Sequence, residues 1–234
     1  MTRPLTVLPV TGVPEVRPGD VLADLLAAAV ELEDGDVVVV TQKVVSKAEG
    51  RLVRLGAEAG AAAAREVVER ESVRVLRRRG DLVISETVHG FVCANAGVDR
   101  SNVEAGTAAL LPVDPDRSAR RIRDGLLGRA GVRVGVIVSD TFGRPWRRGL
   151  TDVAIGAAGV AAVVDLRGTT DAAGRELVVT EVCVADELAS AAELVMGKAA
   201  GIPAAVVRGV DAAWLRESSV RTEVVRPPSE DLFR

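Results

Sequence analysis

The chain has 234 residues, of which 48% are hydrophobic and 2% aromatic, and its formal net charge is −3 at pH 7. This length allows one large domain or two small ones, and the apolar content is enough to bury a sizeable core. The weakly negative charge gives no reason to expect nucleic acid as a partner, and no apolar run approaches the roughly 20 residues of a membrane-spanning helix.

Two further features bear on the cellular compartment. The N-terminal segment MTRPLTVLPV has neither a long apolar core nor a cleavage site, so we expect no signal peptide. Cys93 and Cys183 lie far apart in apolar contexts, which favours buried free thiols over a disulfide. These features predict a cytoplasmic protein.

Strands and helices alternate in the first half of the chain. Asp20 is expected to cap a helix that runs to about residue 31. A second helix is predicted over residues 57–79, because its Ala-rich and Glu/Arg-rich turns have high helix propensity, and Gly80 ends it. The predicted strands cover residues 6–10, 37–41, 82–85 and 90–94, with the last two paired.

The second half continues the alternation with less regularity. Residues 110–116 are expected to be extended because two prolines oppose helix, and Ser118 is expected to cap a helix that Gly131 ends. This order indicates a mixed α/β (α+β) class and a single domain over residues 1–234, without repeats or a clean boundary. The remaining predicted elements are strands over 132–138, 177–184 and 204–207 and a helix over 186–199.

The most informative segment is VGVIVSDTFGRPWRRG, at residues 134–149. Its first half is a β-branched apolar run, which predicts a strand buried on both faces, and Asp140 is predicted to stand where that strand ends. Ligands of open α/β sheets bind at the carboxyl ends of strands. A carboxylate there, followed by three arginines beginning with Arg144, suits a metal ion and a multiply charged anion. The alternative is an ordinary charged turn.

Several familiar chemistries are excluded. No GxxxxGK sequence followed by Ser or Thr is present, and no GxGxxG follows a strand, so a nucleotide must be held in another way. Zinc is disfavoured because His89 is the only histidine and the two cysteines lack ligand spacing. Hard oxygen ligands and cationic side chains remain as the available chemistry.

A basic cluster follows the second predicted strand, in the sequence QKVVSKAEGR at residues 42–51. Its lysines, Lys47 among them, can reach phosphate oxygens as point charges. The alternative is a solvated edge between a strand and a helix.

A second cluster, NAGVDRSN at residues 95–102, contains Asp99 in a turn-rich loop. Asp and Asn side chains there can ligate Mg²⁺ or Mn²⁺, or can serve ordinary turn chemistry. If the strands before Asp99 and Asp140 converge, the two carboxylates could bridge metals as in two-metal phosphoryl transfer.

Six segments, in the same order, resemble the coenzyme F-420-0:L-glutamate ligase family, the γ-glutamyl ligases of the deazaflavin coenzyme F-420. They extend from about residue 8 to residue 209. The segments are LPVTGVPEVRPGD, DGDVVVVTQKVVSKAEGR, NAGVDRSNV, LLPVDPDRSA, GVIVSDTFGRPWRRGLTDVAIGAAG and GRELVVTEVCVADELASAAELVMGKAAGIPAAVVRG.

The resemblance implies a ligase that joins a carboxylate of the precursor F-420-0 to the amine of L-glutamate and then adds γ-linked glutamates. GTP hydrolysis to GDP and phosphate would drive the reaction through an acyl phosphate. The implied cofactors are Mg²⁺ or Mn²⁺, with two ions expected, and K⁺ as a further candidate. The implied structure is a two-lobed fold in an intertwined homodimer.

The resemblance also implies roles for individual residues. Asp99 and Asp140 match the metal-binding aspartates of the family, and Thr141 matches a second metal ligand beside them. The candidate catalytic residues are Asp140, Lys47 and Arg144, the last as an anion clamp with structural ion pairing as its alternative. The residues implied to bind GTP are Val13, Pro14, Glu15, Val16, Gln42, Lys47, Asn102, Met196, Gly197 and Gly201.

The chain departs from the family pattern at three places. Relatives often have an aromatic residue just before the glycine of the loop DLRGTTDAAGREL, where this chain has Ala173, which weakens any expectation of substrate stacking there. Some relatives carry an acidic residue where this chain has Lys198, which puts a metal contact there in question, and some carry a C-terminal nitroreductase-like domain, so the resemblance is to the stand-alone form. Two other functions stay open: a metal-dependent nucleotide phosphohydrolase that uses the same aspartates, and a non-catalytic nucleotide-binding protein.

Overall fold

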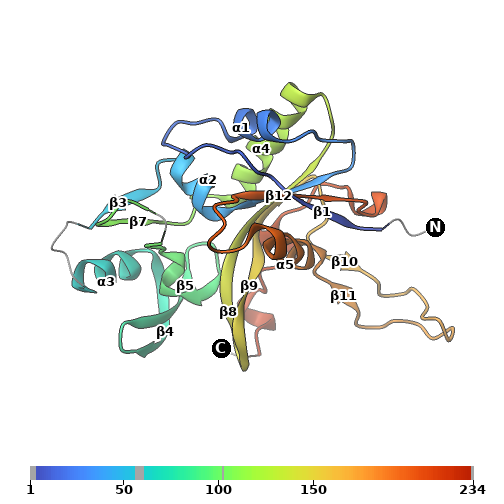
Figure 1. Cartoon of the computed structure of the whole chain (residues 1–234). Coiled ribbons are helices and arrows are strands. Elements are labelled where there is room, and N and C mark those ends of the chain that lie inside the picture. Colours follow the sequence, from blue (N-terminus) through green and yellow to red (C-terminus); the bar gives the residue numbers. More distant parts are fainter. Residues whose placement is uncertain (1–3, 56–60, 102, 233–234) are drawn as a thin grey trace.

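The structure is a computed structural model that describes residues 4–55, 61–101 and 103–232. A five-stranded sheet with the order β1-β12-β2-β8-β9 forms its centre (Figure 1). β2 and β8 are parallel, and the other neighbours are antiparallel. The five strands are β1 (Thr6–Pro9), β2 (Val37–Thr41), β8 (Gly135–Arg144), β9 (Arg147–Ala158) and β12 (Ala204–Arg208).

The two central strands are buried on both faces, as their uninterrupted valine runs predict. Val37 to Val40 on β2 and Val136 to Val138 on β8 have no exposed surface. Residues from both faces of β2 and β8 belong to one large core cluster, so neither strand has a solvent face to alternate with. This parallel pair carries the carboxyl-terminal edge at which the candidate site lies.

Helices cover both faces of the central sheet. α1 (Leu22–Ala29) and α4 (Pro115–Ala130) lie above it in Figure 1, and α5 (Val184–Met196) lies below. Gly156 on β9 permits the close approach of α4, because a Cβ atom there would lie 2.3 Å from the Pro115 carbonyl.

Two predicted helix caps are wrong. α1 begins at Leu22, and the Asp20 carboxylate instead accepts the N–H of Arg17 at 2.7 Å in the preceding turn. α4 begins at Pro115 rather than at Ser118, because proline is well suited to the first helical position. Asp114 is its cap and accepts the N–H of Arg117 at 2.9 Å. The predicted end is confirmed: Gly131 adopts φ 72° after the last turn.

The helix predicted over 57–79 is also wrong in its second half. α3 (Ala61–Arg70) ends before a strand, β4 (Ser72–Arg79), which pairs antiparallel with β5 (Leu82–Thr87). Residues 57–60 lie outside the described residues. Arginine has high helix propensity, but the pairing with β5 decides the conformation of this segment.

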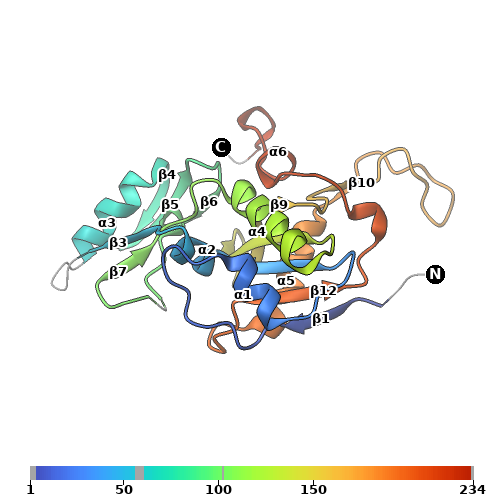
Figure 2. The ribbon, with the colours of Figure 1, turned by 90° about the horizontal axis from the view of Figure 1, so that it is seen from above.

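A side module, formed by β3, α3, β4, β5, β6 and β7, flanks one end of the central sheet (Figure 2). β5 pairs with β6 (Val92–Ala94), as predicted for these two segments, and β3 (Leu52–Arg54) pairs with β7 (Thr107–Ala109). The module has two small hydrophobic clusters of its own. Phe91 joins it to the central sheet through an edge contact with Phe142 of β8, with ring centroids 6.3 Å apart.

The strand that contains Asp140 is longer than predicted. β8 does not end there but runs on to Arg144 and returns as β9, so Asp140 lies within a hairpin opposite Val153. The strand predicted over 177–184 is also wrong in extent, because only β11 (Glu181–Val182) forms, paired with β10 (Val164–Asp165), and α5 begins at Val184.

The remaining short elements complete the chain. They are α2 (Gln42–Ala48), η1 (Asn95–Gly97), η2 (Ala212–Trp214), α6 (Val220–Glu223) and η3 (Pro228–Glu230). Both cysteines are free, with Cys93 buried and Cys183 half-buried. Among the helices of the described residues, none has the length and apolar character needed to cross a bilayer.

Candidate active site

A cleft of about 850 Å³ opens where β2 and β8 leave the core, between the central sheet and the side module. Thr41 and Gln42 line it from the end of β2, and Ser139 to Phe142 line it from β8. Asp99 faces it from the loop after β6, and the segment after α5 closes the remaining side. The cleft therefore lies at the carboxyl edge of a parallel strand pair, where ligands bind in open α/β sheets.

The cationic side chains of this cleft are all lysines. The chain has only three lysines among its 30 basic residues, and Lys43, Lys47 and Lys198 all line this one cleft. The carboxylates of the same lining are those of Glu15, Asp99, Asp140, Asp152 and Glu193. When all of these groups are ionised, five carboxylates against three ammonium groups leave two negative charges, which suits a site for a cation.

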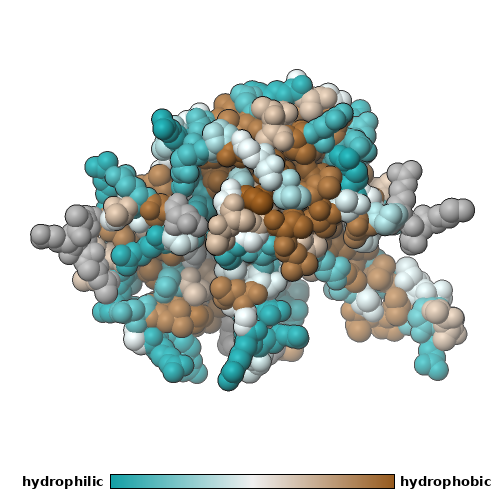
Figure 3. Space-filling view, viewed as in Figure 1, coloured by the Kyte–Doolittle hydropathy of each residue, from teal (hydrophilic) through white to brown (hydrophobic). Residues whose placement is uncertain are grey.

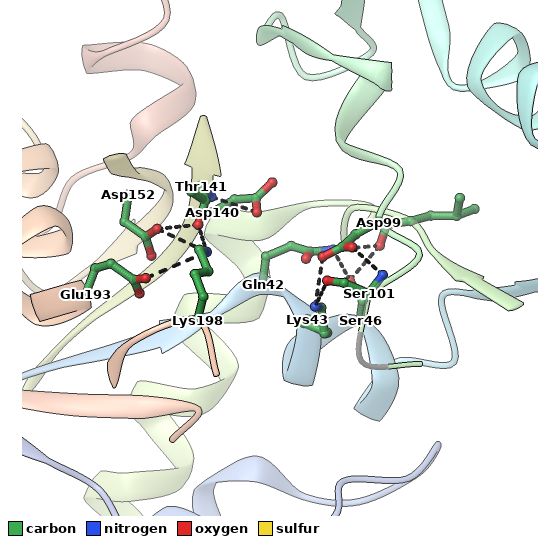
Figure 4. Close-up of polar contacts among 11 residues, drawn as sticks. Gln42, Lys43, Ser46, Asp99, Ser101, Asp140, Thr141, Asp152, Glu193 and Lys198 are labelled. Carbon is green, nitrogen blue, oxygen red and sulfur yellow. Dashed lines mark hydrogen bonds and ion pairs between the residues drawn. The ribbon is translucent and has the colours of Figure 1, made fainter. Parts of the chain in front are cut away.

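Asp99 is held by the backbone and by a lysine. It forms a β-bridge with Ala109, which anchors the loop on the side module. Its carboxylate accepts the N–H of Ser101 at 2.7 Å and pairs with Lys43 Nζ at 2.9 Å (Figure 4). Burial raises the pKa of Asp99, but the hydrogen bonds from Lys43 and Ser101 outweigh it and hold the pKa below its ordinary value.

Asp140 lies between two groups of polar side chains in the cleft, one around Asp99 and the other around Lys198 (Figure 4). Its carboxylate accepts the N–H of Thr141 at 2.8 Å. Burial raises its pKa to about 7; the Thr141 hydrogen bond opposes this, and the charges of Asp152 and Asp99 add to it. A buried carboxylate close to other negative charges is stabilised by a cation placed between it and its acidic neighbours.

Thr141 and Asp152 face each other across the β8–β9 hairpin. Asp152 is 1% exposed; it accepts a hydrogen bond from Ser139 Oγ at 3.0 Å and another from the Thr141 hydroxyl. Lys198 Nζ reaches the same corner, where it hydrogen-bonds to Thr141 Oγ1 and lies 3.6 Å from Asp152 Oδ1 and 3.9 Å from Glu193 Oε1. Burial and the charge of Asp152 raise the pKa of Glu193.

Gln42 is the first residue of α2, and Lys47 lies in the last turn of the same helix. The Gln42 amide donates to Ser46 Oγ at 3.0 Å and to the Leu110 carbonyl at 3.1 Å, so this buried side chain ties α2 to the segment after β7. Lys47 Nζ pairs with Glu15 at 2.5 Å at the cleft wall. These contacts join the N-terminal loop, α2 and the side module into one rim.

Known proteins resemble this chain over almost its whole length. Residues 12–209 match the family described as F420-0:Gamma-glutamyl ligase. The chain belongs to this family. Proteins named Coenzyme F420:L-glutamate ligase share 47% identity in Methanopyrus kandleri, covering 94% of both chains, and 42% in Methanothermobacter thermautotrophicus, covering 98% of this chain and 99% of that one. The protein of this name from Archaeoglobus fulgidus is 45% identical, over 97% of this chain and 96% of its own.

Most residues expected to act in an F420-0:gamma-glutamyl ligase lie in the cleft. The structure brings together Asp99, Asp140, Thr141, Gln42, Lys47, Glu15, Gly197 and Gly201. Their sequence positions span nearly 190 residues, so the convergence is a property of the fold.

Other expected residues lie elsewhere. Val16 and Met196 are core side chains, and Val13 packs against that core. Pro14 is exposed beside Glu15 and is not part of the cleft lining. Arg144 is exposed at the tip of the β8–β9 hairpin, outside the lining. Asn102 lies outside the described residues.

Three lining residues were missed by sequence reasoning: Asp152, Glu193 and, as a partner of Asp99, Lys43. Asp152 and Glu193 occur singly within a strand and a helix, where an acidic residue is unremarkable. Lys43 was visible as part of the basic cluster, but nothing in its sequence context pairs it with Asp99.

The donor set fits a hard divalent cation. Within the described part of the chain, no three His, Cys, Asp or Glu residues are arranged to hold a metal by themselves. Asp99 and Asp140 offer carboxylate oxygens on facing sides of the cleft, a donor type that Mg²⁺ and Mn²⁺ accept together with water and phosphate oxygens. A site completed by a nucleotide therefore fits these residues better than an all-protein cage.

A second pocket, of about 970 Å³, lies at the opposite end of the sheet. Several of its charged side chains pair with one another: Arg208 pairs with Asp36 at 2.8 Å, and Arg123 pairs with Glu217. It contains none of the family's expected site residues, so we place the chemistry in the smaller cleft.

Proposed function

We propose that this chain is a GTP-dependent ligase that joins L-glutamate to the deazaflavin precursor F420-0 and extends the product with γ-linked glutamates. The observation that carries the proposal is the cleft that is lined by Asp99, Asp140 and the three lysines of the chain, in a member of the F420-0:gamma-glutamyl ligase family. Oxygen ligands for a cation and point charges for phosphates meet there, as phosphoryl transfer requires.

The lysines would hold the triphosphate. Lys47 has its ammonium on the rim formed by Glu15 and α2, with only 12% of its side chain exposed, so it has little freedom away from the cleft. A lysine contacts phosphate oxygens as a mobile point charge and needs no fixed fork geometry. Gly197 and Gly201, in the segment after α5, also line the cleft and leave room for the nucleotide next to the backbone.

The reaction would proceed in two steps. A carboxylate oxygen of the precursor attacks the γ-phosphorus of GTP, the bond to the β-phosphate oxygen breaks, and GDP leaves with that electron pair. The glutamate amine then attacks the acyl carbon, phosphate leaves, and the amine loses a proton as the amide forms. The cleft supplies orientation and neutralises charge; both are effective in phosphoryl transfer.

Asp99 and Asp140 would hold the divalent cation, Mg²⁺ or Mn²⁺, with Thr141 beside them. When bound, the cation neutralises charge on the β- and γ-phosphates during transfer. Asp140 would be its principal ligand, because Lys43 already compensates Asp99. Arg144 would bind an anionic group of a ligand that extends from the cleft to the exposed tip of the β8–β9 hairpin.

We also propose that the protein acts as a homodimer. Large apolar side chains are exposed on the two projecting hairpins: Trp146 (85%) and Leu150 (68%) on β8–β9, and Val178 (72%) and Val179 (84%) near β11. Figure 3 shows apolar surface gathered on the β10–β11 arm. Light scattering should give a mass near 49 kDa, twice the 24.4 kDa of the chain.

Coupled nucleotide hydrolysis tests the class of reaction. A ligase should release GDP only when both L-glutamate and F420-0 are present with Mg²⁺ or Mn²⁺. Release of GDP at the same rate without the amine acceptor would instead indicate the nucleotide phosphohydrolase, and binding without release would indicate a non-catalytic protein.

The contribution of Lys47 to GTP affinity can be measured directly. Lys47→Ala should weaken GTP binding roughly 10- to 100-fold, because a charge-assisted hydrogen bond contributes about 1.5–3 kcal/mol. Titration calorimetry with GTP gives the Kd. Arg78→Ala is the control, since Arg78 pairs with Glu69 on the side module away from the cleft. A Kd equal to that of the unmodified protein would remove Lys47 from the nucleotide site.

A further inference from the structure

Lys198 occupies a cage of oxygen atoms. It follows α5 and extends its ammonium toward Thr141 Oγ1, Asp152 Oδ1 and Glu193 Oε1 (Figure 4). A hydroxyl and two carboxylates around one positive charge are the donors that would otherwise surround a metal ion.

The carboxylates of this cage are largely buried and belong to β9 and α5, whereas the Lys198 side chain reaches them from the solvent-exposed side. The Asp152 side chain is 2% exposed and that of Glu193 20%, but that of Lys198 is 60% exposed. Asp152 is held in place by Ser139 and Thr141. A carboxylate so far from water is strongly destabilised without a nearby cation, and Lys198 is the only cationic side chain that the structure describes within 4 Å of it.

The other carboxylates of the cleft are compensated differently. Lys43 pairs with Asp99, and Lys47 pairs with Glu15. Asp140 forms no ion pair within 4 Å among the described residues. Its carboxylate is therefore the one in the cleft that is available to bind an added cation. When all five carboxylates of the cleft are ionised, the three lysines leave two negative charges, which one divalent ion neutralises.

We propose that Lys198 is a built-in counter-cation that takes the position of a second divalent ion, so that this chain binds one divalent cation, at Asp99 and Asp140, and not two. The inference rests on the proposed function only for that first ion. Lys198 is a positioning residue: it holds Thr141 and Asp152, and its charge repels a second dication from the same oxygens.

Counting bound Mn²⁺ tests the proposal without any turnover. The metal-stripped full-length protein is titrated with MnCl₂, and free Mn²⁺ is measured by its electron paramagnetic resonance signal. The unmodified protein should bind one Mn²⁺ per chain. Lys198→Glu, which replaces the ammonium with a third carboxylate, should bind two, and adding Glu193→Gln to that variant should return the count to one.

Two further variants separate the charge of Lys198 from its bulk. Lys198→Arg should keep the count at one and the melting temperature unchanged. Lys198→Met should lower the melting temperature in metal-free buffer, because Asp152 loses its counter-charge, and Mn²⁺ should raise it more than in the unmodified protein. Arg78→Glu is the control, since it makes the same charge change at an exposed ion pair outside the cleft and should leave the count at one.

The outcomes discriminate between this inference and the proposed function. Two Mn²⁺ per chain in the unmodified protein, or a single Mn²⁺ in folded Lys198→Glu, would overturn the inference. No Mn²⁺ in the unmodified protein but one in Lys198→Glu would support the role of Lys198 and contradict the metal site at Asp99 and Asp140. No binding in either protein would overturn both.

Discussion

Asp140→Asn should abolish ligase turnover, by at least about 10³-fold, while making the metal-free protein more stable. The loss of activity follows because an amide cannot supply the negative oxygen that the divalent cation requires, and such a cation contributes several kcal/mol to transfer. The gain in stability follows from the same carboxylate, because burial raises its pKa from 3.8 to about 7. Function and stability therefore oppose each other at this position.

The direction of the pH dependence follows from the raised pKa. Since the folded protein binds the proton more tightly than the unfolded chain, the charge of Asp140 destabilises the fold increasingly as pH rises from about 4 to 7, and fully above 7. The size of the pKa shift sets an upper limit of about 4 kcal/mol on this penalty. The penalty lies below that limit because the cleft admits some solvent. Each kcal/mol changes the melting temperature by about 2–4 °C in a protein of this size.

Thermal melts in metal-free buffer measure this effect. Asp140→Asn should melt several degrees above the unmodified protein at pH 8, and the difference should shrink to less than half at pH 5. Asp81→Asn is the matched control, because Asp81 is exposed in the turn between β4 and β5, pairs with Arg65 at 2.7 Å, and should change neither the activity nor the melting comparison between the two pH values. An Asp140→Asn protein with full activity would remove Asp140 from the metal site.

Asp116→Ala should destabilise the fold by about 4 kcal/mol or more, the largest effect that we expect from a residue outside the cleft. Asp116 is 5% exposed in the first turn of α4. Its carboxylate accepts hydrogen bonds from Ala157 N at 2.8 Å and Val220 N at 2.9 Å, and from Ser219 Oγ at 2.8 Å and Arg221 N at 3.2 Å. One side chain therefore joins α4, β9 and the start of α6.

The size of this effect comes from the donors left behind. Each buried donor without a partner costs about 1–3 kcal/mol. Alanine would leave two buried donors, Ala157 N and Val220 N, without a partner and would also remove two part-buried hydrogen bonds, from Ser219 Oγ and Arg221 N. Urea denaturation at fixed protein concentration gives the free energy of unfolding. Asp114→Ala is the control: it removes a single exposed cap bond to Arg117 and should cost about 1 kcal/mol. Equal losses in the two variants would show that the Asp116 network does not stabilise the fold.

The central sheet was predictable because its signal is local. Consecutive valines of β2 and β8 point to both faces of the sheet, so they are removed from water only when both faces are covered. The sequence pattern therefore predicts the burial that the structure shows. The second half of the helix predicted over 57–79 failed for the opposite reason. Its arginines favour helix locally, whereas β4 is set by pairing with β5, a contact that the local pattern does not reveal.

The site was predictable only in part. Asp140 was found because an acidic residue after an apolar run is conspicuous, although the strand continues past it into the hairpin. Asp152 was missed because it reaches the cleft only through the register that places it opposite Thr141. The pairing of Lys43 with Asp99 joins α2 to the loop after β6 across 56 positions, and no local pattern reports it.

The mass of the product tests the central claim most directly. The purified protein is incubated with GTP, Mg²⁺ or Mn²⁺, L-glutamate and F420-0, and the deazaflavin is analysed by mass spectrometry. The proposed function predicts a product heavier by one or more glutamyl residues, formed only with GTP and lost in Asp140→Asn. A deazaflavin of unchanged mass, under conditions in which the protein binds GTP and consumes it, would contradict the ligase assignment.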